Sequence, residues 1–120
     1  MNAGLARFSY KEHTGYVSRT SVPGRTWAPS AEELLEFEKG LPAYLKAELP
    51  EGLEGTKGWY RQYSGSIDER GVRILEVAFF CEVSNLKGWG EYPVLVLGAG
   101  SCHFEVFYDT DSRKFTYLPG

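Results

Sequence analysis

The apolar residues between positions 34 and 45 recur with the period of a helix. Leu34, Phe37, Leu41 and Leu45 lie three or four residues apart. A helix with this spacing carries one apolar stripe, which must be buried against another element. A sheet is the natural partner for a single amphipathic helix.

Capping and terminating residues mark the boundaries of this helix. Ser30 and Glu33 form a capping box, in which each side chain can bind the backbone amide of the other residue. Pro50 ends the helical pattern. Pro42 lies inside it, and proline removes one helical hydrogen bond, so we expect either a kink or a break between two helical segments. The sequence therefore predicts a kinked helix within residues 29–49.

Alternating apolar and polar positions in the second half of the chain predict strands. The strongest such segment is VRILEVAFFCEV, residues 72–83. Its odd positions, including Leu75, Val77 and Phe79, are apolar, whereas its even positions are mixed, so the odd face should point at the helix. Further strands are predicted at residues 59–67, 93–97, 102–109 and 114–118, with turns at 68–71 and 110–113.

A helix followed by consecutive strands with short turns predicts an α+β fold. The chain of 120 residues has the length of one domain. We expect residues 1–28 to be irregular or to contain a short strand, residues 29–49 to form the helix, and residues 58–118 to form the sheet. The sheet is predicted to be a curved antiparallel meander of four to five strands, with the helix packed on one face.

Composition and charge indicate which partners and which location to expect. Aromatic residues make up 15% of the chain, which suits a sheet with broad side chains. The net charge is −3 and Lys and Arg are scattered, so we expect no nucleic acid or anionic membrane as a partner. No apolar run has the length of a membrane span. The N-terminal residues show no apolar leader, so we expect a cytoplasmic location for the chain as given. If a leader has been removed from it, we expect the periplasm instead.

The segment GAGSCH, residues 98–103, resembles chemistry that its context does not support. A dinucleotide loop needs a third glycine where His103 stands and a helix afterwards, but strand character follows. Cys102 and His103 point to opposite faces of a strand, so they do not form a thiolate–imidazole pair. We therefore interpret the glycines as a bend or bulge and expect no catalytic residue and no cofactor.

The two cysteines allow two arrangements. If the chain reverses at residues 98–100, Cys81 and Cys102 lie on nearby strands and a disulfide is possible. If one bulged strand continues through these residues, the two cysteines lie too far apart for a bridge. Two cysteines and the distant His13 do not suggest a metal site, so we expect no bound metal.

Five residues are candidates for partner binding. Trp89 lies on a glycine-bracketed loop that suits an exposed anchor, although it could equally fold back to cap the sheet. Tyr92 is close to Trp89 in the sequence. The other three candidates lie on predicted strands, where they could line a binding surface or form a solvated strand face: Arg61, Tyr63 and His103.

Three carboxylates on the predicted strands suggest a further possibility. Glu76, Glu82 and Glu105 all lie on strands, and two of them could share a face. Paired carboxylates suit acid–base chemistry, but charged strand residues are far more often only solvated.

Three segments together resemble a family. WAPSAEELLEFEKGLPAYL, YRQYSGSIDERGVRILEVAFFCE and PVLVLGAGSCHFEVFYDTDSRKFTYLPG resemble small uncharacterised bacterial proteins in which a helix precedes a meander. The chain departs from their Asp-Gly-Gly turn, because it has Gly98-Ala99-Gly100. The resemblance implies a cystatin-like arrangement, with one helix on a curved antiparallel sheet, and it implies no catalytic residues.

These observations favour a non-enzymatic protein that binds a protein partner, as an inhibitor or a toxin-immunity protein does. The acidic balance suits a basic partner. The alternative is a small-molecule-binding or enzymatic domain with an aromatic pocket between helix and sheet. A homodimer formed through the terminal edge strand is a third possibility.

Overall fold

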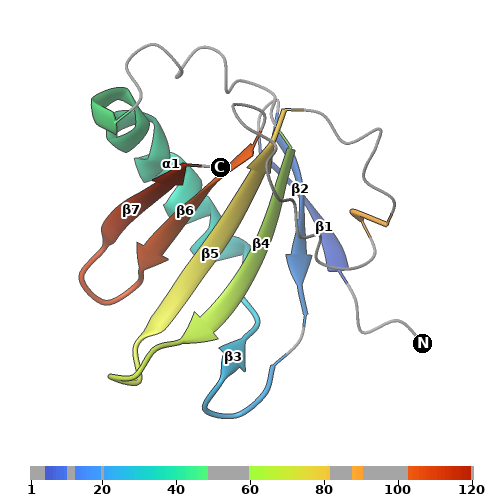
Figure 1. Cartoon of the computed structure of the whole chain (residues 1–120). Coiled ribbons are helices and arrows are strands. Elements are labelled where there is room, and N and C mark those ends of the chain that lie inside the picture. The colour runs from blue at the N-terminus through green and yellow to red at the C-terminus, as the bar shows by residue number, and fades with distance from the viewer. Residues whose placement is uncertain are drawn as a thin grey trace.

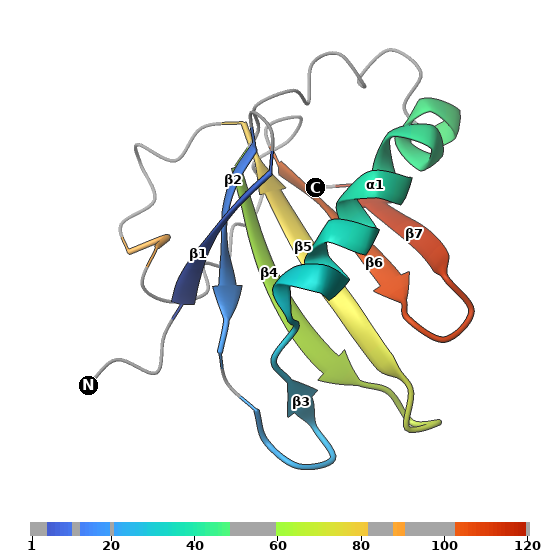
Figure 2. The ribbon, with the colours of Figure 1, turned by 180° about the vertical axis from the view of Figure 1, so that it is seen from behind.

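A computed structural model of the chain describes residues 5–10, 13–19, 21–48, 60–81, 88–90 and 103–119. Within these residues, one helix packs against one face of a seven-stranded sheet. Figures 1 and 2 view this arrangement from opposite sides. The elements in chain order are β1 (Leu5–Tyr10), β2 (His13–Ser18), β3 (Thr26–Trp27), α1 (Ala31–Glu48), β4 (Tyr60–Ile67), β5 (Arg73–Phe80), β6 (His103–Asp109) and β7 (Lys114–Pro119).

The sheet is open and mixed. Its strand order is β1-β2-β4-β5-β6-β7, and β3 also pairs with β4. All neighbouring strands are antiparallel except β2 and β4, which run parallel. The predicted α+β class with one helix on a sheet is confirmed. The predicted number of four to five strands is wrong, because the first 28 residues, expected to be mostly irregular, supply three strands.

The helix begins where the capping box predicts. The amide of Ser30 donates to Oε1 of Glu33 at 2.8 Å, and the amide of Glu33 donates to Oγ of Ser30 at 3.2 Å. The helix then continues through Pro42 to Glu48 as one element, so the alternative of two separate segments is wrong. Leu41 and Leu45 lie on either side of Pro42 and are both buried, and this packing holds the two turns in one helix.

The helix-facing side of β5 is the predicted one. Leu75, Val77 and Phe79 are at most 1% exposed and belong to the central apolar cluster. Each lies opposite a buried residue of β6, for example Val77 opposite Val106, so the inward-facing rows of the strands are in register. The odd face of β5 therefore forms the floor on which α1 rests.

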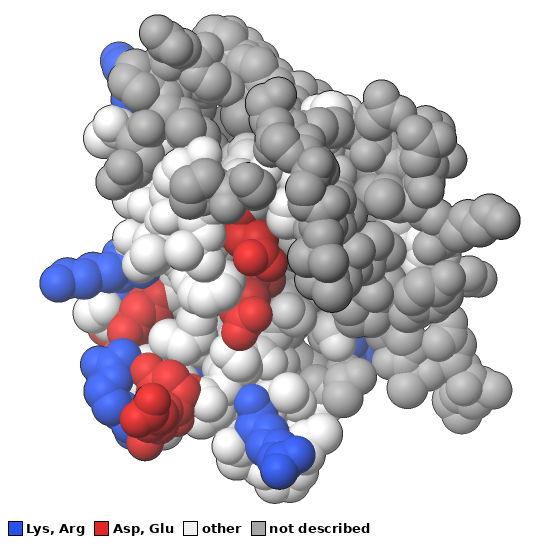
Figure 3. All heavy atoms as spheres, in the orientation of Figure 1, with Lys and Arg blue, Asp and Glu red and all other residues white. Residues whose placement is uncertain are grey.

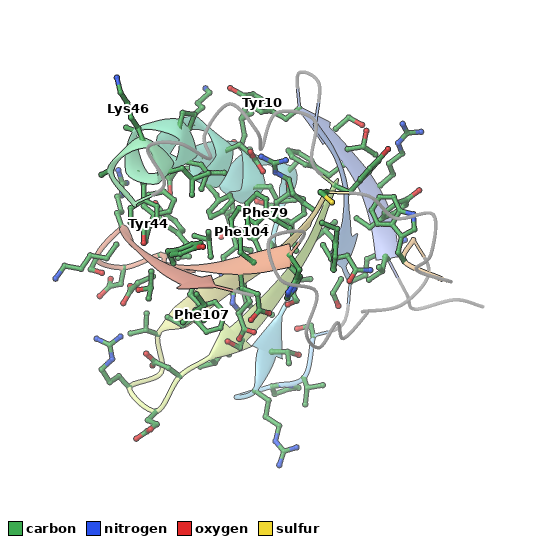
Figure 4. The ribbon with its side chains drawn as sticks, turned by 45° about the horizontal axis from the view of Figure 1, so that its top comes forward. Tyr10, Tyr44, Lys46, Phe79, Phe104 and Phe107 are labelled. Atoms are coloured by element: carbon green, nitrogen blue, oxygen red, sulfur yellow. The ribbon has the colours of Figure 1, made fainter. Side chains whose placement is uncertain are left out.

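Aromatic rings fill the space between α1 and the sheet. Phe37 of α1 has its ring centroid 6.4 Å from that of Tyr63, 5.8 Å from Tyr108 and 5.6 Å from Phe115. These edge-on and tilted contacts are the geometries that aromatic pairs prefer. Figure 4 shows Phe79 on the same side of the sheet as the helix. The aromatic residues between α1 and the sheet therefore form part of the packed core.

A charged cluster is buried within this core. Arg61 donates from Nε to Oε2 of Glu38 at 2.7 Å, and the hydroxyl of Tyr63 donates to the same oxygen at 2.6 Å. All three residues are 2% exposed. The guanidinium carbon of Arg61 also lies 4.6 Å from the centre of the Phe79 ring. The cluster thus ties α1 to β4 by charge-assisted hydrogen bonds.

This burial corrects the assignment of Arg61 and Tyr63 to a partner-binding surface. The two residues lie on the odd positions of β4, opposite Phe79 and Val77 of β5, and that face is covered by α1. Alternation along the strand turns both side chains toward the helix, where Glu38 satisfies them. They act in the core and present nothing to a partner.

Replacing Arg61 should show how strongly the cluster holds the fold. Arg61→Met leaves the Glu38 carboxylate buried without its cation, so we expect the free energy of unfolding to fall by about 3–5 kcal/mol. Urea denaturation measures the change. The triple variant R61M/E38M/Y63F removes every polar member and should recover most of the loss, because apolar replacement of a whole buried cluster is often close to neutral. A single variant as stable as the wild type would contradict this account.

Tyr63 should make stability fall at alkaline pH. Burial, followed by the negative charge of Glu38, raises the pKa of the Tyr63 hydroxyl far above its usual value. The unfolded chain therefore loses this proton near pH 10 while the folded chain keeps it, so folding weakens as pH rises above that value. Above pH 10, we expect wild-type stability to fall by up to about 1.4 kcal/mol per pH unit more steeply than that of Tyr63→Phe. Urea denaturation between pH 8 and 11 is the measurement, and parallel curves would refute the effect.

Candidate protein-binding face

The side of the sheet opposite α1 is the candidate site, and it is called the outer face below. Strand alternation assigns to it the residues that point away from the helix. Figure 1 views the molecule from this side, with α1 behind the strands, and Figure 2 shows the helix on the other side. In the part that the structure describes, the outer face includes Tyr60, Gln62, Ser64, Ile74, Glu76, Ala78, Phe80, His103, Glu105, Phe107, Asp109 and Thr116.

Two carboxylates meet in the middle of the outer face. Glu105 of β6 lies directly opposite Ala78 of β5, two residues along from Glu76, so the two glutamates are diagonal neighbours. Diagonal neighbours of this kind stand about 7–8 Å apart. Both are half-buried, and among the described residues neither has an ion pair. Figure 3 shows acidic atoms in the middle of this face, with uncharged atoms of the described residues along one side of them.

Asp109, in contrast to Glu76 and Glu105, has an ion-pair partner. Asp109 follows Phe107 on the same face of β6, but Nη2 of Arg70 lies 3.0 Å from its Oδ2. The backbone amides of Ser112 and Asp111 and this arginine lower the pKa of the Asp109 carboxyl. Asp109 is therefore occupied in holding two turns together, whereas the charges of Glu76 and Glu105 have no such partner among the described residues.

Apolar side chains surround the two carboxylates. Phe107 lies directly opposite Glu76, and Ile74 and Ala78 flank Glu76 on its own strand. All three are half-buried. Figure 4 shows Phe107 on the opposite side of the sheet from Phe79 and Phe104. The face thus combines two negative charges with apolar contact area, which is the composition of a surface for a cationic side chain with a long apolar stem.

His103 lies at one end of the outer face. Its ring stacks on that of Phe80, with centroids 5.2 Å apart and an interplanar angle of 29°. His103 is half-buried and Phe80 is 1% exposed. His103 also shares its side of β6 with Glu105, two residues along. The structure therefore places this predicted binding residue on the outer face.

Trp89 lies over the β2–β4 side of the outer face. Its ring contacts Tyr16 edge-on at 4.7 Å and Tyr60 edge-on at 5.2 Å between centroids. Gln62 donates from Nε2 to the backbone carbonyl of Trp89. Gly90 packs so closely that a Cβ there would lie 2.8 Å from Cζ of Tyr16. Of the two expected placements, Trp89 adopts the one that caps the sheet, and it remains half-buried at the rim of the face.

Several predicted features fall outside the described residues. Tyr92, Glu82 and the Gly98–Gly100 bend belong to that part, as does the strand predicted at 93–97. Cys81 is disulfide-bonded in the structure. Its expected partner, Cys102, also lies outside the described residues, so the pairing remains a prediction.

Phe107 is the residue of the face that the sequence interpretation missed. It lies in HFEVFYD, where Phe104, Val106 and Tyr108 alternate into the core. The same alternation puts Phe107 beside Glu105 on the other side. An aromatic residue on the polar phase of an alternating strand was the available signal.

Metal sites, membrane-spanning helices and comparisons with known proteins suggest no other role for the outer face. Among the described residues, no group of three His, Cys, Asp or Glu side chains could hold a metal ion. Of the helices in the described part of the chain, none combines the length and apolar character that a membrane crossing requires. The chain matches no family model, no curated protein and no solved structure. The interpretation of the outer face therefore rests on its own geometry.

The two glutamates should weaken the fold slightly. Like charges on neighbouring strands repel, so Glu76→Gln should raise the free energy of unfolding by about 0.2–0.5 kcal/mol at low salt. The gain should shrink in 1 M NaCl, where the Debye length is about 3 Å. Urea denaturation at both salt concentrations measures it. Glu69→Gln, at an exposed turn, is the control, and an equal gain in both variants would contradict the repulsion.

Proposed function

We propose that this is a non-enzymatic bacterial protein whose outer face binds a basic protein partner, as an inhibitor or a toxin-immunity protein does. The proposal rests on one observation. Glu76 and Glu105 lie half-buried beside Phe107, without an ion pair among the described residues. The same proposal treats the fold as a seven-stranded variant of the cystatin-like arrangement.

Charge supports a cationic partner. The chain carries a net charge of −3, and the two carboxylates concentrate negative charge at the centre of the face. An arginine or lysine from the partner would donate hydrogen bonds to both carboxylates, and such charge-assisted bonds are stronger than neutral ones. Its stem or guanidinium would lie against the Phe107 ring. This arrangement would give the interface a central anchor.

The shape of the site supports a protein over a small molecule. A pocket for a small ligand would need open space between α1 and the sheet. Phe37 and Tyr63 are at most 2% exposed in that space, and their rings pack against other rings. The outer face, in contrast, presents side chains from several adjacent strands, with Trp89 at its rim. A broad face with an aromatic rim suits a protein surface.

The test joins capture of a partner to mapping of the face. Immobilised wild-type protein is used to capture proteins from a bacterial lysate, and mass spectrometry identifies them. The affinity of the purified partner is then measured by isothermal titration calorimetry for the wild type and for the charge-reversal variant E76K/E105K. We expect the partner to be basic and the variant to bind at least about 100-fold more weakly, because a buried charge pair at an interface becomes a repulsion.

A matched variant controls for net charge. E32K/E69K reverses two exposed glutamates on α1 and on the β4–β5 turn, so its net charge equals that of E76K/E105K. We expect it to keep nearly wild-type affinity. Equal weakening by both variants, or capture that E76K/E105K leaves unchanged, would refute the outer face as the binding site.

A further inference from the structure

The free edge of β7 carries a second surface. Among the described strands β7 pairs only with β6, so its other side is an edge of the described sheet. Phe115 and Tyr117 pack against the core cluster on this strand but remain half-buried, and Leu118 is also half-buried. An edge with partly exposed aromatic side chains is a template for pairing with another strand.

A flank of α1 adjoins this edge. The ring of Tyr44 stacks on Phe115 with centroids 5.1 Å apart, and a Cβ on Gly40 would lie 3.1 Å from the same ring. Ala43 lies one turn and Ala47 two turns beyond Gly40, and both are exposed. In Figures 1 and 2 the C-terminal end of α1 extends past β7 on its unpaired side. Small side chains on this flank would allow a second helix to approach closely.

We propose that a second copy of this chain occupies the β7 edge, forming an antiparallel β7–β7 pair about a two-fold axis perpendicular to the sheet. In such a dimer both copies contribute the same surface. Both sheets then join into one, and both helices lie on the same side of it. The flank of one α1 with Gly40, Ala43 and Ala47 would face the same flank of the other.

The sequence of β7 is self-complementary in one register. With Thr116 opposite its own counterpart, Phe115 of one copy faces Tyr117 of the other, and Lys114 faces Leu118. Aromatic pairs and a lysine stem over leucine are favourable cross-strand neighbours, and no like charges meet. If Phe115 instead lies opposite its own counterpart, fewer residues of β7 are paired. If Tyr117 does, the pairing includes Pro119, which has no amide hydrogen to donate.

The central position of this register supplies a direct test. Thr116 is exposed and would face Thr116 of the other copy. Thr116→Lys and Thr116→Glu each place like charges opposite one another, so each variant should dimerise about 100-fold more weakly than the wild type. An equimolar mixture of the two variants should restore a heterodimer, because the charges are then opposite. Sedimentation velocity over a range of protein concentrations measures each state against the 13.5 kDa monomer.

Two control variants locate the interface. Ser9→Lys makes the same change at an exposed position of β1, the opposite edge strand, and should leave the dimer intact. Ala43→Arg on the proposed helix flank should weaken the dimer, whereas Ala31→Arg, exposed on the opposite flank of α1, should not. The helix variants keep the test decisive if a Thr116 variant does not fold, which circular dichroism would reveal.

The results separate this proposal from its alternatives. A wild-type protein that stays monomeric at all concentrations overturns it, including the case in which the edge binds only a foreign peptide. A dimer that Ser9→Lys dissociates, or that both Thr116 variants leave unchanged, also overturns it. E76K/E105K should dimerise normally, so failure of the outer-face proposal and failure of this one give different results.

Discussion

The burial of one face of the sheet by a single helix is the constraint on which the rest of the structure depends. The apolar stripe of α1 covers the inward-facing residues of the strands, including Phe79 of β5 and Val106 of β6. Because side chains alternate along each strand, every inward residue has neighbours that point the other way. One helix can cover only one face, so other contacts decide how much of the outer face is exposed. Trp89 lies over its β2–β4 side and Phe80 is 1% exposed, whereas Glu76, Glu105 and Phe107 remain partly exposed.

A buried charged cluster fixes how the helix lies on the sheet. Glu38 accepts hydrogen bonds from Arg61 and Tyr63 through a single oxygen, and Arg61 also lies over the ring of Phe79. Removing these charges from water is costly, so the cluster is only tolerable when its geometry satisfies each group. An apolar interface could slide by a turn at little cost, whereas these directional bonds accept one placement of α1 on β4.

The two proposed surfaces would bind their partners through different interactions. The outer face offers charge and an aromatic ring to a chemically complementary partner, and its glutamates repel one another while it is empty. The β7 edge offers backbone hydrogen bonds and self-complementary side chains, which favour a second copy of the chain. Because the dimer axis lies at the edge of the sheet, one dimer would present two outer faces. Two linked faces would strengthen binding to a partner that can reach both.

Local features could be predicted from the sequence. Ser30 and Glu33 are three residues apart, so their mutual hydrogen bonds need only a helical turn to form. The inward face of β5 was also predictable, because its apolar phase is carried by consecutive alternate residues. The β1–β3 region was harder to predict, since its strands are short, contain glycine and polar residues, and include a parallel pairing with the distant β4.

By itself the sequence determined the class of fold, the start of the helix and the side of β5 that faces it. The tertiary structure decided which charged residues are buried and which meet on the outer face. Arg61 and Glu105 both read as polar strand residues, yet one is satisfied in the core by Glu38 and the other lies diagonal to Glu76. The physical reason is that hydrophobic period is a property of neighbouring residues, whereas strand register and the placement of a helix are set by contacts between distant ones.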